Sequence, residues 1–518
     1  MAEILTRHGW LCDTEDVTDT RQWESRPGPG PLALTANEIA AATGGRIVRS
    51  TARPISGAAV DSRQVQPGNL FVALPGENTD GHRFVGAAIA AGAAALLVRD
   101  EEAAAAADVL AAEAASTDVA IVSVPDTLLG LHAVASDWRR RFSPLVVGVT
   151  GSIAKTSTKE AVAAVLSRRF VTLKSEGNAN NEVGLPLTLM RLGPEHEAAV
   201  LEMGMYVGGE IAQLAAMALP KVGVVTAVHE VHLSRIGTID AVERAKAELV
   251  EALPADGFAI LNADDPRVAR MRDRTSARTI TYGFSSAADV RAVDIVSNGQ
   301  DGMAFTLVVP DGAAHMTAYV ATPALGRHGV HNGLAAAAVG MAAGLELDEI
   351  AAGLGDGWQA AHRDQLVRIP GLTILDDTYN ASPASMRAAL ELLATLPGRH
   401  VAVLGEMFEL GEAHERGHHD VGVAAAGLVD ELIVVGTGAA GIAAGAKALG
   451  EGVVLVPDRD AAIPVLRQRL RRNDVVLVKA SRGAALELIV EFLIDNFGGW
   501  TADGGARGEA RQTGEEVW

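Results

Sequence analysis

The sequence contains a single cysteine, Cys12, among 518 residues, which excludes an internal disulfide framework and fits a reducing compartment. Positive charge is scarce too, because 44 lysines and arginines stand against 64 aspartates and glutamates and leave a net charge of −20. This balance disfavours nonspecific binding to nucleic acid or to anionic membrane surfaces. It does not exclude an anionic substrate, since a local pocket can be positive inside an acidic protein.

Long apolar runs are also lacking. The longest small and apolar stretch, residues 87–98, is well short of the roughly 18 residues that span a bilayer. The N-terminus is acidic and lacks the basic start and apolar core of a signal peptide. We therefore expect a soluble, cytoplasmic and monomeric protein with no membrane insertion and no nucleic-acid partner.

Short β-branched runs alternate with alanine- and leucine-rich helical stretches between two polar tails, residues 1–31 and 498–518. Apolar runs separated by helices are typical of parallel strands buried on both faces, so the sequence predicts α/β architecture throughout. Residues 103–115 predict a peripheral helix. Domain boundaries near residues 128 and 360 would give domains over 32–128, 129–360 and 361–497. The predicted strands include residues 145–149, 222–227, 373–375, 401–404, 432–435 and 475–478.

The most informative local motif is a strand that runs into a small-residue loop and then a helix, over residues 146–158. Backbone N–H groups and the positive helix end would face an anion there, Lys155 could reach terminal phosphates, and the Thr156 hydroxyl could ligate Mg²⁺. The alternative is an ordinary strand-to-helix turn. Ala154 stands where phosphate loops normally carry glycine, and a positive φ at this position would cost roughly 1–2 kcal/mol.

This loop and a series of further motifs resemble the Mur ligase family over nearly all of residues 32–495. The motifs lie at residues 61–63, 68–76, 80–82, 150–157, 177–186, 201–204, 232–233, 245–248, 261–265, 376–383, 403–411 and 479–482.

The resemblance implies three domains: one that holds the UDP end of the substrate, a central parallel-sheet ATPase domain with a P-loop, and a C-terminal Rossmann-like domain. It also implies an ATP-dependent, ADP-forming amide ligase of peptidoglycan precursor synthesis that works through an acyl phosphate. The runs at 180–186 and 376–383 are similar to those of the member that joins UDP-muramoyl tripeptide and D-alanyl-D-alanine. The Tyr-Ala-His run and the Asp-Asn-Pro-Arg motif of the member for the preceding step are absent.

The resemblance also assigns roles to individual residues. ATP would contact Gly151, Ser152, Ile153, Ala154, Lys155, Thr156, Ser157, Asn332 on the adenine side, Arg363 and Asp377. Two Mg²⁺ ions would be held by Thr156, Glu202, His232 and a carbamylated Lys246. The catalytic residues would be Lys155, His232, Lys246 and Arg363, and the other substrates would contact Ser62, Arg63, Asn178, Asn180, Asn181 and Asn380.

Several alternatives stay open at this point. From spacing alone, Lys246 would be a solvated helix residue, His232 a surface histidine and Glu202 a loop charge. The chain departs from the family pattern at Ala154, Tyr206, Gly329 and His362. It could be a family ligase for a different amine, or a catalytically silent nucleotide-binding relative that acts as a partner subunit.

One competing motif, His-Glu-Arg-Gly-His at 414–418, fits the pattern of zinc proteases. We expect no zinc site, because Gly417 should weaken the required helix and a third ligand is also needed. The family pattern already accounts for His418.

Overall fold

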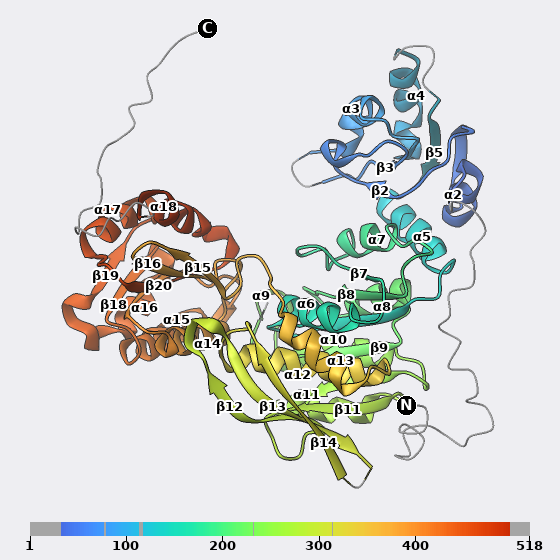
Figure 1. Cartoon of the computed structure of the whole chain (residues 1–518). Helices are drawn as coiled ribbons and strands as arrows, with labels where there is room; N and C mark the ends of the chain where they lie inside the picture. The colour runs from blue at the N-terminus through green and yellow to red at the C-terminus, as the bar shows by residue number, and fades with distance from the viewer. Residues whose placement is uncertain (1–32, 77–78, 113–117, 232, 313, 498–518) are drawn as a thin grey trace, which may run out of the picture.

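The computed structural model describes residues 33–76, 79–112, 118–231, 233–312 and 314–497. Three sheets follow one another along the chain, each flanked by helices (Figure 1). This arrangement confirms the predicted α/β class.

The first sheet has five strands in the order β1-β5-β4-β3-β2. All neighbouring pairs are parallel except β1 with β5. The predicted peripheral helix is present as α4, Ala103–Ala112. The other elements are α2 (Ala36–Thr43), β1 (Arg46–Arg49), β2 (Ala58–Ala59), β3 (Leu70–Val72), α3 (Val85–Ala90), β4 (Ala95–Arg99), β5 (Ala120–Val124) and α5 (Thr127–Arg139).

The central sheet has nine strands in the order β14-β13-β12-β11-β10-β9-β6-β8-β7. Helices cover both faces of its parallel part, and alternate residues of the inner strand β6 enter different cores: Val146 packs into one and Val147 into the other. This two-sided burial explains why the strand is apolar throughout. The strands are β6 (Leu145–Thr150), β7 (Thr172–Lys174), β8 (Ala198–Glu202), β9 (Val222–Val225), β10 (Phe258–Asn262), β11 (Arg278–Gly283), β12 (Val290–Ser297), β13 (Met303–Asp311) and β14 (Ala314–Thr322).

Strand β13 pairs antiparallel with both β12 and β14, so this edge of the sheet differs from its parallel remainder. Direct hairpin connections require no helix between strands, whereas parallel crossovers do. The helices of this part are α6 (Lys155–Leu166), α7 (Gly184–Leu189), α8 (Glu210–Ala218), α9 (Leu233–Ile236), α10 (Ile239–Glu251), α11 (Pro266–Ala269), α12 (Gly326–Ala342) and α13 (Leu347–Asp356).

The third sheet has six strands in the order β15-β16-β20-β17-β18-β19, and only β15 runs antiparallel to its neighbour. Helices pack on both faces, as in a dinucleotide-binding fold. The elements are β15 (Gln365–Ile369), β16 (Leu372–Asp376), α14 (Pro383–Thr395), β17 (Arg399–Gly405), α15 (His414–Ala426), β18 (Glu431–Val435), α16 (Ala440–Gly445), β19 (Val453–Val456), α17 (Arg459–Arg469), β20 (Asp474–Lys479) and α18 (Glu487–Phe497).

The zinc-protease pattern at residues 414–418 lies at the start of α15. Helix α15 runs without interruption through Gly417, so this glycine does not break the helix that a zinc-protease site requires. Both ring nitrogens of His418 are nevertheless engaged: Nε2 accepts from the Met407 N–H at 2.9 Å, and Nδ1 lies 2.7 Å from the His414 carbonyl. The ring is therefore a structural part of the core.

Among the described helices, none has the length and apolar character needed to cross a membrane. Residue 128 falls in the first turn of α5, and residue 360 lies between α13 and β15, so the domain boundaries stay a prediction. The two tails and Cys12 lie outside the described residues. The cytoplasmic location and the monomeric state also stay predictions.

Candidate active site

The predicted phosphate loop joins β6 to α6, between inner strands of the central sheet. Gly151 has φ 153°, and a Cβ there would collide with the Thr226 hydroxyl, so only glycine fits. Ala154 has φ 64° and ψ 4° and directly precedes the helix. The predicted cost of roughly 1–2 kcal/mol for alanine therefore applies. The loop nevertheless keeps the strand-to-helix geometry in which backbone N–H groups can face a phosphate.

The residues nearest this loop leave polar atoms unpaired. The Thr156 hydroxyl is buried with no hydrogen-bond partner among the described residues, and so is Oε2 of Glu202. Oε1 of Glu202 accepts a hydrogen bond from the Asn180 amide at 2.7 Å. Lys155 donates to the Gly151 carbonyl at 2.9 Å, and burial lowers the pKa of its ammonium, an effect that Glu202 opposes. Oxygen donors left unpaired in this way suit a hard cation such as Mg²⁺.

Lys246 lies on α10 and lines a cavity of about 170 Å³ together with Lys155, Asn180 and Glu202. Only 2% of it is exposed, so it is not a solvated helix residue. Burial first, and the charge of Lys155 second, hold its pKa well below the usual range. His232 lies outside the described residues. Within the described residues, no three His, Cys, Asp or Glu side chains converge on a metal position, which leaves Thr156, Glu202 and Lys246 as the described part of the predicted metal site.

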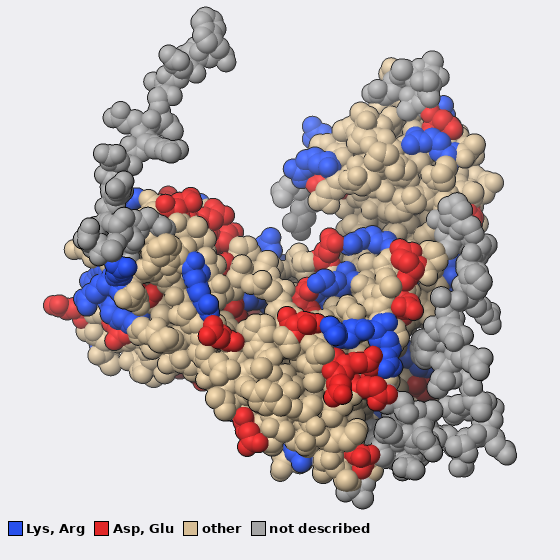
Figure 2. All heavy atoms as spheres, viewed as in Figure 1, with Lys and Arg blue, Asp and Glu red and all other residues tan. Residues whose placement is uncertain are grey.

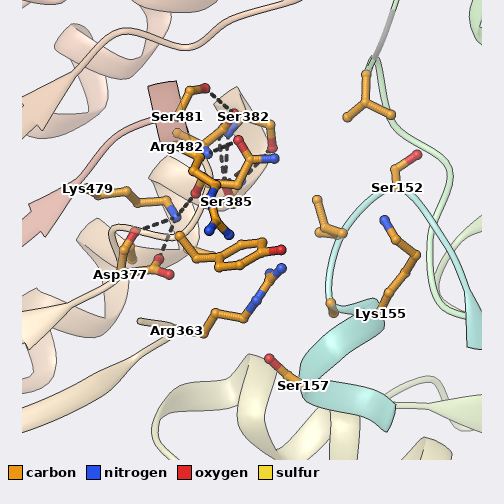
Figure 3. Close-up of a pocket in the computed structure, with 18 of the residues that line it drawn as sticks. Ser152, Lys155, Ser157, Arg363, Asp377, Ser382, Ser385, Lys479, Ser481 and Arg482 are labelled. Atoms are coloured by element: carbon orange, nitrogen blue, oxygen red, sulfur yellow. Dashed lines mark hydrogen bonds and ion pairs between the residues drawn. The ribbon is translucent and has the colours of Figure 1, made fainter. Parts of the chain in front are cut away.

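The C-terminal domain supplies the opposite wall (Figure 3). A cavity of about 380 Å³ is lined on one side by the phosphate loop and on the other by Arg363, Asp377 and Asn380. The Arg363 guanidinium lies 4.1 Å from the centre of the Tyr379 ring. The predicted nucleotide contacts from the two domains therefore face one another.

Lys479 belongs to the motif at residues 479–482, but the resemblance assigned it no role. Its ammonium donates to Asp377 at 2.6 Å and to the Asn380 carbonyl at 2.8 Å. Burial raises the pKa of Asp377 to about 6, although Lys479 opposes the shift. The sequence does contain a signal for this pair, namely a lysine at the end of an otherwise apolar strand. A buried ammonium requires a partner.

A third cavity, of about 570 Å³, opens beside the loop where the adenine is predicted to lie. It is lined by Asn332, Gly329 and Trp358, as well as by Ser157. The side-chain oxygen Oδ1 of Asn332 accepts a hydrogen bond from the Thr158 hydroxyl at 3.2 Å. The side-chain N–H groups of Asn332 are therefore available to donate to a ligand.

The predicted substrate contacts are only partly brought together. Asn178 lines the same cavities as Lys155, and Tyr206 does so too. Asn181 lines the cavity of about 170 Å³, but its side-chain oxygen Oδ1 accepts a hydrogen bond from the Gly184 N–H at 2.9 Å, at the start of α7. Ser62 and Arg63 lie in the first domain and line none of these cavities. Figure 2 shows an open hollow between that domain and the C-terminal one.

Three consecutive segments match the family descriptions. Residues 54–139 match the Mur ligase family, catalytic domain, residues 149–340 the Mur ligase middle domain, and residues 362–482 the Mur ligase, glutamate ligase domain. The chain is 36% identical to the UDP-N-acetylmuramoyl-tripeptide--D-alanyl-D-alanine ligase of Mycobacterium tuberculosis, over 89% of this chain and 98% of the relative. The chain belongs to the Mur ligase family.

Further relatives of this Mur ligase carry the same name. The Escherichia coli ligase is 37% identical over 84% of this chain and 93% of its own length. A crystal structure of MurF from Acinetobacter baumannii superposes with a TM-score of 0.79 at 30% identity, over 90% of this chain and 99% of that chain. The Thermotoga maritima MurF ligase in complex with ADP has a TM-score of 0.72 at 28% identity, over 85% and 97%. The resemblance and the three-domain architecture inferred from the sequence are confirmed.

Proposed function

We propose that this Mur ligase uses ATP to join D-alanyl-D-alanine to UDP-N-acetylmuramoyl-tripeptide. The observation that carries the proposal is the cavity in which the phosphate loop faces Arg363, Asp377 and Asn380 of the C-terminal domain. The relatives' shared name supplies the two substrates. A cavity between domains suits a reaction whose reactants arrive on different domains.

The nucleotide would lie across the start of α6. Its phosphates would meet the loop N–H groups, Lys155 and Arg363, and its adenine would enter the cavity of about 570 Å³ beside Asn332. The ADP that the Thermotoga maritima relative holds supports this use of the fold.

Thr156 and Glu202 would hold Mg²⁺, because each has a buried oxygen with no partner among the described residues. His232 and a carbamylated Lys246 would complete the ligand set for two ions. Bound Mg²⁺ would neutralise charge on the transferring phosphoryl group.

The reaction would proceed in two steps. The terminal carboxylate of the tripeptide attacks the γ-phosphorus of ATP, which forms an acyl phosphate and releases ADP. The dipeptide amine then attacks the acyl carbon, loses a proton, and expels phosphate as the amide forms. Lys155 and Arg363 would offset the negative charge that builds up in the first step. Closure of the domains would keep water from the acyl phosphate.

We further propose that Lys246 is carbamylated. Its amine would attack CO₂, form an N–C bond and release one proton, which leaves an anionic carbamate beside Glu202. Two features support this: the side chain is buried, and burial together with Lys155 lowers its pKa, so the reactive neutral amine is favoured.

Phosphate release measured with Mg-ATP, UDP-muramoyl tripeptide and D-alanyl-D-alanine tests the main proposal. We expect release to require both acceptor and dipeptide, and single amino acids to replace the dipeptide poorly. Preference for a single amino acid would identify a ligase for another amine. Absence of turnover with every amine would identify a catalytically silent relative.

A further inference from the structure

The chain passes from the central domain to the C-terminal domain through an unusual turn. Arg363 stands between two non-glycine residues with left-handed backbone: His362 has φ 57° and Asp364 has φ 47°. L-residues rarely adopt this conformation, and it persists where the surrounding structure holds the backbone in place. The contacts of His362 and Asp364 therefore show what holds the turn.

His362 is tied to the C-terminal domain. Its Nδ1 lies 2.7 Å from Oδ2 of Asp376, at the end of β16. The other oxygen of Asp376 accepts from the Thr378 N–H at 3.1 Å and from the Thr378 hydroxyl at 2.7 Å, so the carboxylate is fixed. The His362 carbonyl also accepts from the Tyr379 N–H at 3.1 Å.

Asp364 is tied to the central domain. Its Oδ2 lies 3.0 Å from Nε2 of His328 on α12, close enough for an ion pair although not aligned as a hydrogen bond. Burial is the largest influence on the pKa of His328 and opposes its charge, yet the nearby Asp364 raises the pKa above the usual value. The two neighbours of Arg363 are thus anchored to different domains.

Arg363 itself makes no ion pair among the described residues. Its guanidinium lies over the Tyr379 ring, and its Nε is buried with no hydrogen-bond partner in the part of the chain that the structure describes. It lines all three cavities around the phosphate loop, and Figure 3 shows the side chain directed across the pocket towards the loop that carries Lys155. A cation held in this way keeps its charge available for an anion.

We propose that His362 and Asp364 are positioning residues, which aim the Arg363 guanidinium at the nucleotide phosphates by fixing its two backbone neighbours to opposite domains. This inference rests on the proposed ATP-dependent function. The physical reason is that a side chain already fixed in its binding direction loses less conformational entropy when the ligand arrives. A further consequence is that Arg363 is presented correctly only while α12 and β16 keep this relative placement.

The test is a double-mutant cycle on His362 and Arg363. His362→Gly keeps a backbone that tolerates φ 57° and removes the pair with Asp376, whereas His362→Asn tolerates this φ and keeps an N–H donor. The control is Asn473→Gly, which makes the same backbone change at φ 69° on an exposed turn of the C-terminal domain. Binding of the non-hydrolysable analogue AMP-PCP with Mg²⁺ is measured by calorimetry, alongside KM for ATP and kcat.

We expect His362→Gly to weaken analogue binding by about fivefold or more and to raise KM for ATP more than it lowers kcat. His362→Asn should retain most of the binding, and Asn473→Gly should match the parent. In an Arg363→Ala background, His362→Gly should cause no further loss, because its effect acts through the arginine.

Full additivity of the two changes, or equal binding by His362→Gly and Asn473→Gly, would overturn the positioning proposal alone. Unchanged binding by Arg363→Ala would overturn both this proposal and the nucleotide role of Arg363. If His362→Gly does not fold, Asp364→Asn enters the same cycle with the same expectation of non-additivity.

Discussion

Two threonines on α6 should respond in opposite ways to replacement by valine, which has nearly the same shape. The Thr156 hydroxyl is buried without a hydrogen-bond partner among the described residues. The Thr158 hydroxyl, also buried, donates to the side-chain oxygen Oδ1 of Asn332 at 3.2 Å. The pair therefore compares an unpaired hydroxyl, which we assign to Mg²⁺, with a paired one on the same helix.

The expected magnitudes follow from the cost of burying polar groups. An unpaired buried hydroxyl costs about 1–3 kcal/mol, and threonine and valine have similar helix propensities. Thr156→Val should therefore raise the free energy of unfolding of the nucleotide-free protein by about 1–2 kcal/mol. Thr158→Val leaves the side-chain oxygen of Asn332 unpaired, so it should lower the free energy of unfolding by about 1–3 kcal/mol.

Nucleotide should reverse the sign of the Thr156→Val effect, so that this variant becomes less stable than the parent at the same nucleotide concentration. A ligand at a hundred times its Kd stabilises the folded state by roughly 2.7 kcal/mol, and Thr156→Val should lose most of that gain together with its metal ligand. Urea denaturation with and without Mg-AMP-PCP measures both effects. Destabilisation by Thr156→Val in the absence of nucleotide, with a full nucleotide-induced gain, would refute the reasoning.

Further predictions concern the same pocket. Lys155→Ala should abolish ligation while circular dichroism shows an intact fold, and turnover within about tenfold of the parent would contradict the phosphate-loop assignment. Ala154→Gly removes the Cβ that would crowd a bound phosphate, so calorimetry should show unchanged or tighter ATP binding; tenfold weaker binding would contradict it. Lys246→Ala should lose most activity and regain part of it with acetate or formate, whereas near-normal turnover would contradict the carbamate. The pKa of Asp377 is about 6 in the fold against 3.8 when unperturbed, so its contribution to stability falls as pH rises between those values. Asp377→Asn should therefore destabilise less at pH 7.5 than at pH 4.5 in urea denaturation, and the opposite trend would contradict the raised pKa.

The sequence by itself determined the parts that depend on neighbours along the chain. A strand, a small-residue loop and a helix that starts at Lys155 occupy consecutive residues, so their geometry follows from local backbone preferences. Strands that are apolar throughout predicted sheets covered on both faces, because no polar face was available for solvent. The order of motifs was enough to indicate the family.

Only the tertiary structure decided how side chains far apart in the chain affect one another. Lys246 has the spacing of a solvated helix residue but is buried, because burial depends on which helix face meets the sheet. The Lys479–Asp377 pair joins residues 102 positions apart, and no local pattern specifies such a pairing. The left-handed backbone at His362 and Asp364 is likewise held by contacts with two domains. Desolvation, charge pairing and backbone strain depend on distances in space, which a linear pattern does not contain.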